Sequence, residues 1–273
     1  MTGVPLERPA RFGERSTLTD EEFAERQAQI QRRFQSFVVG AWGESGKAQR
    51  QASLIVDPPN GRMPALTPEG EKRSAPMGSS WQSRPFNGPE DFDTWDRCIS
   101  RGLLPSMLPA QYSNGLEIHQ APGYVVIRNE MIHEARIIPL TGRPHLSKAI
   151  QQYMGDSRGH WEGESLIVET SNFNGKTAAT NPGTSGSPMQ NNIPTSDALR
   201  ILERFTRVDA DTINYEATIE DPVVFTRPWK VAYPFRRNPD YVLYEYACHE
   251  GNYALANLLS GSQAEQRARE NNQ

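Results

Sequence analysis

The sequence predicts a mainly β protein: an antiparallel up-and-down barrel, preceded by a helical and extended appendage and followed by a short helix. Three observations predict this class. From about residue 115 onward, apolar and polar residues alternate with period two, which is typical of half-buried strands. Short turns rich in Gly, Pro, Asn and Asp separate these stretches. The chain of 273 residues also contains 21 glycines and 21 prolines, which favour turns over long helices.

The first 105 residues read as an N-terminal appendage with little β pattern. A capping-box-like start and apolar residues at helical spacing predict a helix over about 18–37. A short apolar strand is expected at 53–56. Residues 57–90 form a wrap or connector rich in Pro, Gly and Ser, and a second helix is expected over about 89–101.

The barrel domain is expected to span residues 106–262. A short helix is predicted at 146–154, a turn at 156–160, and a last helix after residue 251. Closure of seven or eight antiparallel strands would remove exposed edges, although a β-sandwich is the alternative. The predicted strands lie at 116–120, 124–131, 133–140, 165–172, 199–208, 213–220, 229–236 and 241–249.

Two segments are expected to lie outside the packed domain. Residues 173–197 are rich in Gly, Ser, Thr and Asn and are longer than ordinary loops, so a lid over the barrel and a disordered segment are both open. The tail 263–273 is almost wholly polar and is expected to fray.

Composition excludes several classes of function. The net charge is -4 and no block of Lys or Arg occurs, so nucleic acid is not an expected partner. No stretch approaches 18 apolar residues, so no membrane span is expected. The first residues lack the charged and apolar regions of a signal peptide. Phosphate-loop, dinucleotide-binding and Gly-x-Ser-x-Gly patterns are absent as well.

The two cysteines, Cys98 and Cys248, are far apart in the chain and form no CxxC motif. They are either two buried reduced thiols or one disulfide. A disulfide closing so long a loop would stabilise the fold by roughly 4–5 kcal/mol through restriction of the unfolded chain. Such a bond requires an oxidising compartment.

Histidines beside glutamates mark the candidate catalytic site. They occur at His133-Glu134, His160-Trp161-Glu162 and His249-Glu250. Imidazole is the side chain that transfers protons near neutral pH, and a nearby carboxylate can orient it. Asp156 is expected to orient His160, and Glu162 is expected within reach of His160 on the same strand face. Adjacent residues of a strand face opposite sides, so these segments form one site only if barrel closure brings them together.

The run from residue 155 to residue 170, GDSRGHWEGESLIVET, resembles a family of exported bacterial proteins with a GDSRGHWEGDTLVVET-like segment. Blocks at 53–59, 130–140, 203–206 and 246–253 match the same family, so the likeness covers most of 50–260. Glu and Ser stand where the family usually has Asp-Thr at 164 and 165. A looser likeness of the Gly-x-Trp kind, at 159–161, is to lipocalin (calycin) barrels.

The resemblance supplies positions and no activity. It implies that relatives carry an export signal, so the chain looks like a mature or trimmed form of a periplasmic or secreted protein. That implication strengthens the disulfide interpretation of Cys98 and Cys248.

The leading hypothesis is an exported enzyme that uses His and carboxylate acid–base chemistry on a small organic molecule in the barrel lumen, as a lyase, isomerase or hydrolase. The alternatives are a lipocalin-like carrier without catalysis and a metalloenzyme with His and Glu ligands. No cofactor is expected, although a divalent metal is left open, as is a homo-oligomer. The expected catalytic residues are His249, His160, His133, Asp156, Glu134 and Glu250. The expected substrate contacts are Arg136, Trp161, Glu162, Tyr246 and Tyr253.

Overall fold

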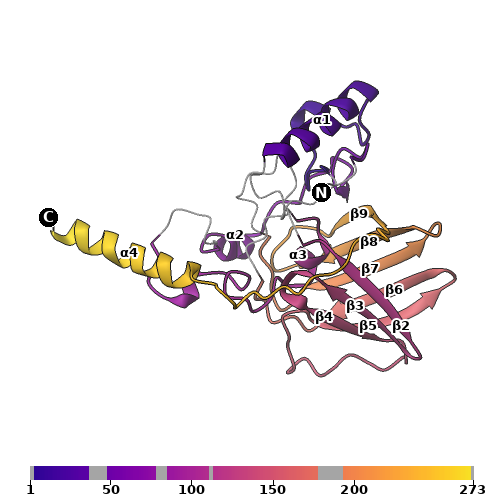
Figure 1. Ribbon diagram of the computed structural model, residues 1–273. Coiled ribbons are helices and arrows are strands. Elements are labelled where there is room, and N and C mark those ends of the chain that lie inside the picture. The colour runs from indigo at the N-terminus through magenta and orange to yellow at the C-terminus, as the bar shows by residue number, and fades with distance from the viewer. Residues whose placement is uncertain (1–2, 37–47, 78–84, 111–112, 178–192, 272–273) are drawn as a thin grey trace.

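Two antiparallel sheets make up the body of the protein (Figure 1). The computed structural model describes residues 3–36, 48–77, 85–110, 113–177 and 193–271. The larger sheet has the strand order β1-β9-β8-β7-β6-β5, and the smaller has the order β2-β3-β4. The strands are β1 (Ile55–Asp57), β2 (Leu116–Ala121), β3 (Tyr124–Asn129), β4 (Ala135–Pro139), β5 (Asp156–Glu162), β6 (Ser165–Ser171), β7 (Arg200–Arg207), β8 (Thr212–Glu220) and β9 (Trp229–Arg236).

The mainly antiparallel β class predicted from the sequence is confirmed, but the described residues form no closed barrel. Strands β4 and β5 lie side by side without a hydrogen-bonded ladder between them. At the other side, β2 pairs only with β3, and β1 pairs only with β9. The two sheets therefore face each other and leave one side open.

Two strand predictions were wrong. The expected turn at 156–160 lies within β5, which pairs with β6 along its whole length. Gly159 lets β5 pack closely on the smaller sheet, because a Cβ there would come within 2.8 Å of Ile138 Cγ2. The expected last strand at 241–249 has no ladder, since β1 already occupies the free edge of β9.

The helices match the sequence predictions only in part. The capping box of α1 (Asp20–Ser36) is confirmed: Thr19 Oγ1 accepts from the amide of Glu22, and Glu22 Oε2 accepts from the amide of Thr19. The other helical elements are η1 (Ala10–Phe12), α2 (Pro68–Ser74), η2 (Pro89–Asp91), α3 (Leu103–Met107), η3 (Met131–His133) and α4 (Ala254–Asn271).

Three helix predictions need correction. The helix expected over 89–101 is only the short η2 followed by turns, because Phe92 has an extended backbone (φ -91°, ψ 148°) and Cys98 has a φ of 55°, and neither fits an α-helix. Residues 146–154 form no helix. The tail expected to fray belongs instead to α4, which extends away from the sheets (Figure 1).

The main hydrophobic core lies between the inner faces of the two sheets. Val125, Ile127 and Ile138 of the smaller sheet are buried with the inward side chains of β6 to β9. The N-terminal segment joins this core through Val4 and Leu6, so the expected appendage contributes buried residues to the β domain. In the described part of the chain, no helix has the length and apolar character needed to cross a membrane. The segment 178–192, most of the predicted lid or disordered loop, lies outside the described residues.

Candidate functional site

A cavity of about 1690 Å³ lies at the open side between the two sheets. Its walls come from β2, the end of β9, the β7–β8 turn and the residues after β9. We call residues 238–252 the C-terminal strap, because this segment runs along the cavity without strand pairing. A cavity of this size exceeds the usual range of roughly 300–1000 Å³ for small-molecule sites, so it has room for an organic ligand and water.

A second cavity of about 460 Å³ adjoins the first one. The two share Ile118, Gln120, Arg207, Asp209 and Ile213 among their lining residues. The smaller cavity reaches between the sheets to buried apolar side chains of β3, β6 and β7, so the interior is accessible from this end of the molecule.

Aromatic side chains form the inner wall where the cavities meet. The register of the larger sheet places Phe205, Tyr215 and Tyr233 in one inward-facing row across β7, β8 and β9. The ring of Tyr215 lies 5.0 Å from that of Phe205 and 4.9 Å from that of Phe235. Phe205 lines the smaller cavity, whereas Tyr233 and Phe235 line the larger one. This wall is rigid because its rings pack against each other.

A fully buried ion pair lies behind this wall. Arg136 of β4 donates to both carboxylate oxygens of Glu203 of β7, at 2.5 and 3.1 Å, and Tyr215 Oη donates to Glu203 Oε1 at 2.9 Å. Glu203 is 0% exposed and Arg136 only 4%. Gly159 of β5 and Ala217 of β8 lie in the same inward-facing row across the sheet as Glu203. Their small size leaves room for the two charged groups.

The ion pair with Glu203 affects the role that was expected for Arg136. The sequence predicted a substrate contact for Arg136, but Glu203 occupies its guanidinium in this structure. Burial, reinforced by the charge of Glu203, raises the pKa of Tyr215 well above its ordinary value. Burial raises the pKa of Tyr233 in the same way, with Glu203 again adding to the shift. Both tyrosines therefore stay protonated near neutral pH and act as hydrogen-bond donors.

Glu134 does not share a site with Arg136, although strand alternation would place two residues at this spacing on one face. Its Oε2 accepts from the amide of Arg101 at 3.3 Å, which ties β4 to the turn before α3. Burial raises the pKa of Glu134, whereas hydrogen bonds from Ser100 and Arg101 oppose that shift.

A second carboxylate, Glu130, lines the larger cavity directly. Its side chain is 6% exposed, and its Oε2 accepts from Tyr241 Oη at 2.5 Å and from the amide of Gly115 at 3.2 Å. The bond to Tyr241 holds the C-terminal strap against the end of β3. No ion pair of Glu130 occurs among the described residues.

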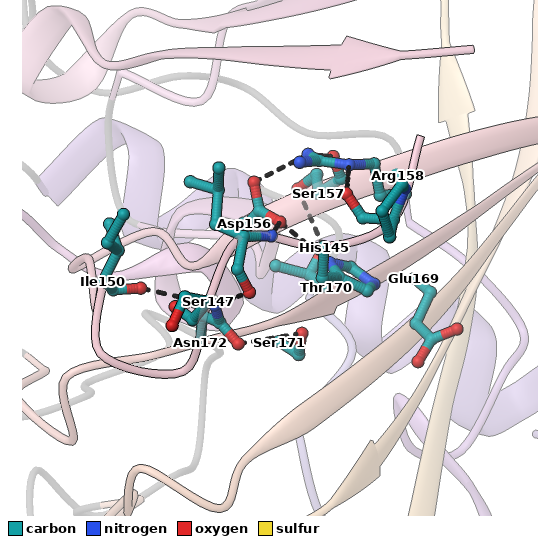
Figure 2. A network of polar contacts seen from close by, with 12 residues as sticks. His145, Ser147, Ile150, Asp156, Ser157, Arg158, Glu169, Thr170, Ser171 and Asn172 are labelled. Carbon is teal, nitrogen blue, oxygen red and sulfur yellow. Dashed lines mark hydrogen bonds and ion pairs between the residues drawn. The ribbon is translucent and has the colours of Figure 1, made fainter. Parts of the chain in front are cut away.

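A separate polar network lies around the start of β5 (Figure 2). Asp156 Oδ2 accepts from His145 Nδ1 at 2.9 Å and from the amide of Leu146 at 3.0 Å, while Asp156 Oδ1 accepts from Arg158 at 2.6 Å. The carboxylate fixes the proton on Nδ1, which leaves the lone pair of a neutral imidazole on Nε2. The side chain of His145 is 25% exposed, so this ring is an oriented and partly accessible base.

The same network explains why residues 146–154 form no helix. The side-chain amide of Asn172 donates to the carbonyls of Leu146, Ser147 and Ile150, at 2.9 to 3.3 Å. Figure 2 shows Ser147 and Ile150 beside Asn172 in this arrangement. These bonds hold the segment as an irregular loop, in which the Ser147 carbonyl also accepts from the amide of Ile150 in a turn.

The three predicted histidines line neither cavity, although Trp161 and Glu250 from their segments do. His133 lies in η3 and donates through Nδ1 to the carbonyl of Tyr246 at 3.1 Å. His160 lies on β5 and donates through Nε2 to Glu162 at 3.3 Å. His249 lies in a turn of the C-terminal strap. All three are exposed, and none of them lines either of the two cavities.

The predicted partner of His160 is also different in the structure. Asp156 was expected to orient His160, but it bonds His145 and Arg158. Glu162 reaches His160, as expected, and it also forms an ion pair with Arg204 at 2.7 Å. Hydrogen bonds from Arg204 and then His160 lower the pKa of Glu162.

Three other predicted site residues do line a cavity. Trp161 lies at the smaller cavity and is 48% exposed, whereas Tyr246 and Glu250 line the larger one. Tyr253 is 73% exposed and lines neither. The candidate ligand contacts are therefore better placed than the candidate catalytic histidines.

The disulfide predicted between Cys98 and Cys248 is present, with a Cα–Cα distance of 5.7 Å. It connects the turns after η2 to the end of the C-terminal strap. Cys248 lines the larger cavity, so the disulfide fixes one wall of the candidate site. The bond fits an oxidising compartment.

The described residues provide no metal centre: no group of three or more His, Cys, Asp or Glu side chains among them is arranged to hold an ion. The proposed metalloenzyme therefore gains no support from this part of the chain.

Comparisons with known proteins do not identify a relative. No protein-family model matches the chain, and neither the curated proteins nor the solved structures contain a significant match.

Sequence reasoning missed three residues that organise the structure: Glu130, His145 and Glu203. Glu130 and Glu203 carried no pattern in the sequence that pointed to burial, because their partners Tyr241 and Arg136 lie in distant segments. His145 carried no signal, because its partner Asp156 lies 11 positions later across an irregular loop.

Proposed function

We propose that the protein binds a small, largely apolar organic molecule in the larger cavity. The observation that carries this proposal is a cavity of about 1690 Å³ between the sheets, with a packed aromatic wall and one nearly buried carboxylate. Apolar walls with a few fixed polar groups are the common composition of small-molecule sites.

The proposed architecture is that of a lipocalin-like carrier. The two sheets would act as the two parts of a barrel whose seam, between β2 and β9, is covered by the C-terminal strap. A ligand in the seam would be in contact with both sheets and with the strap. This arrangement would make the bound molecule part of the structure that holds the sheets together.

Direct binding of a neutral fluorescent probe tests the proposal. N-phenyl-1-naphthylamine should bind with increased fluorescence, and replacing Ile118 by Trp should weaken its binding at least about tenfold by filling space common to both cavities. Ile118 is 37% exposed on an edge strand, so the larger ring should not disturb the fold.

A matched control uses the same substitution at a site outside the cavities. Ile137 is 62% exposed on β4, the opposite edge strand of the same sheet, and lines neither cavity, so Ile137→Trp should leave probe affinity unchanged. Failure of the wild-type protein to bind the probe, or equal effects of the two substitutions, would contradict the proposal.

An acid–base enzyme remains a second candidate, now favoured by one observation. The His145–Asp156 pair has the geometry of an oriented general base, which the predicted residues His133, His160 and His249 lack in this structure. A panel of activated esters would test it. Turnover that His145→Asn abolishes in a folded protein supports the enzyme, and turnover insensitive to that change removes His145 from consideration.

We also propose that the protein acts in the periplasm or outside the cell, as the family resemblance implies. The disulfide supports this location, because cytosolic thiols are kept reduced. Alkylation of the protein as isolated from its native cells should find both cysteines blocked, whereas two free thiols would contradict the proposed location.

A further inference from the structure

The residues that line the larger cavity carry an excess of negative charge, which disfavours an anionic ligand. Seven carboxylates and three arginines are among its lining residues, and the described lining contains no lysine or histidine. Its arginines also have partners: Arg207 donates to the carbonyl of Asp209, and Arg237 lies 3.6 Å from a carboxylate oxygen of Asp211. The excess charge of the lining residues is therefore negative, with seven carboxylates against three arginines.

One of these carboxylates is suited to bind a ligand group directly. Glu130 is 94% removed from solvent by the protein, yet it borders the cavity and has no cation partner among the described residues. Both of its hydrogen bonds, from Tyr241 and Gly115, reach the same oxygen, Oε2. A buried carboxylate without a cation is costly, and a positive group from a ligand would offset that cost.

The surrounding wall is aromatic, which favours the same kind of ligand. Trp95 and Phe235 line the cavity, together with Tyr241 and the other tyrosines of the C-terminal strap. The faces of aromatic rings carry negative potential and attract ammonium groups, with the largest effect where water is excluded. Aromatic faces beside a fixed carboxylate are the common means by which proteins recognise amines.

We propose that the larger cavity takes an organic cation, with an aromatic or aliphatic body and a protonated amine placed against Glu130. This inference rests on the proposed small-molecule binding and assigns the ligand its chemical class. The body would displace water from the aromatic wall, and the ammonium group would donate to the Glu130 carboxylate.

A series of ligands that differ only in their polar end tests the charge. We would measure binding of 4-phenylbutylamine, 4-phenylbutanol and 4-phenylbutanoate to the full chain by isothermal titration calorimetry at neutral pH. We expect the amine to bind at least about tenfold tighter than the alcohol, because hydrogen bonds between charged groups are the stronger ones, and the carboxylate to bind weakest.

Two variants locate the charge that matters. Glu130→Gln keeps the shape and the acceptor for Tyr241, and it should lower amine affinity about tenfold while leaving alcohol affinity within about threefold. Glu245→Gln is the matched control, because Glu245 is an exposed carboxylate that lines the same cavity. It should have little effect on either ligand.

The outcomes separate the two proposals. If none of the three compounds binds, small-molecule binding in this cavity fails as a whole. If all three bind equally, or the carboxylate binds best, the cavity binds ligands but the cation assignment is wrong. Equal effects of the two Gln variants would contradict the role of Glu130. Should Glu130→Gln not fold, the ranking of the three compounds on the wild-type protein decides the question.

Discussion

Glu203 and Glu162 lie on β7 and β5 of the same sheet, and each is bonded to an arginine, but their surroundings are opposite. Glu203 is completely buried between the sheets and accepts from Arg136 and Tyr215. The Glu162 side chain is 50% exposed and accepts from Arg204 and His160. Removing a charge from water is costly, so the interior pair depends on its partner far more than the surface pair does.

This difference shows which charged residues matter to the protein. The sequence drew attention to His160 and Glu162 because they are close in the chain, yet they form an exposed surface pair. Arg136 and Glu203 are 67 positions apart and form the buried pair. Proximity in the sequence is therefore a weak guide to a site on strands, whereas burial is a strong one.

Replacing Glu203 by Gln should have the largest effect on stability, because Glu203 belongs to the buried pair. The change leaves the buried guanidinium of Arg136 without a carboxylate, so the free energy of unfolding should fall by roughly 3–5 kcal/mol. Urea denaturation measures this loss. The double variant Arg136→Met with Glu203→Leu should recover most of the stability, because no unpaired charge remains. A loss below about 1 kcal/mol for Glu203→Gln would show that the pair is not buried as described.

The network around Asp156 is intermediate in burial between the Glu203 pair and the Glu162 pair. Its carboxylate is only 7% exposed, but its partners lie near the surface. Asp156→Asn replaces the charged acceptor of His145, Leu146 and Arg158. We expect a loss of about 1–3 kcal/mol and faster amide hydrogen exchange at Leu146. Ser147→Ala, which removes one long hydrogen bond of 3.4 Å to Ala149 in the same loop, serves as the control and should have little effect. Unchanged exchange at Leu146 in the Asn variant would contradict the anchoring role.

The buried carboxyl group of Glu134 should make the stability of the protein depend on pH. Burial raises its pKa above the ordinary value of 4.5, so the folded state holds this proton more tightly than the unfolded state. Its contribution to stability is therefore fully present below the unfolded pKa and decreases as pH rises through the folded pKa. The unfolding free energy of the wild type minus that of Glu134→Gln should fall from pH 3 toward neutral pH. A difference that stays constant or rises would contradict the raised pKa.

The smallest effect is expected at the surface pair. Glu162→Gln removes an acceptor that solvent and salt already screen, although hydrogen bonds from Arg204 and His160 lower its pKa. The urea midpoint at neutral pH should stay within error of the wild type. A clear drop in that midpoint would mean that the outer face of β5 is as important to the fold as the interior.

Much of the fold was accessible from the sequence, and the failures have physical causes. The capping box at Thr19 and the alternation in β7 and β8 were read correctly, because they depend on neighbouring residues. The expected strand at 241–249 has a similar alternation, but its place beside β9 is taken by β1. The pattern of a segment does not say which edge is free.

The candidate site was accessible to a smaller extent. Trp161, Tyr246 and Glu250 were expected at the site and do line the cavities, while His133, His160 and His249 do not. The disulfide between Cys98 and Cys248 was one of two open interpretations, which the family resemblance favoured, and the structure contains it. Glu130 and His145 were missed, because their importance comes from burial and from partners in other segments.

Local patterns were enough to give the antiparallel strands, most of the turns and the first helix, since hydrogen bonding and alternation act over a few residues. Packing of one sheet on the other brought Arg136 into contact with Glu203, and the irregular loop before β5 brought His145 into contact with Asp156. It also decided that the sheets leave one side open, where the cavity forms. These outcomes depend on contacts between distant segments and on the exclusion of water, which no short stretch of sequence contains.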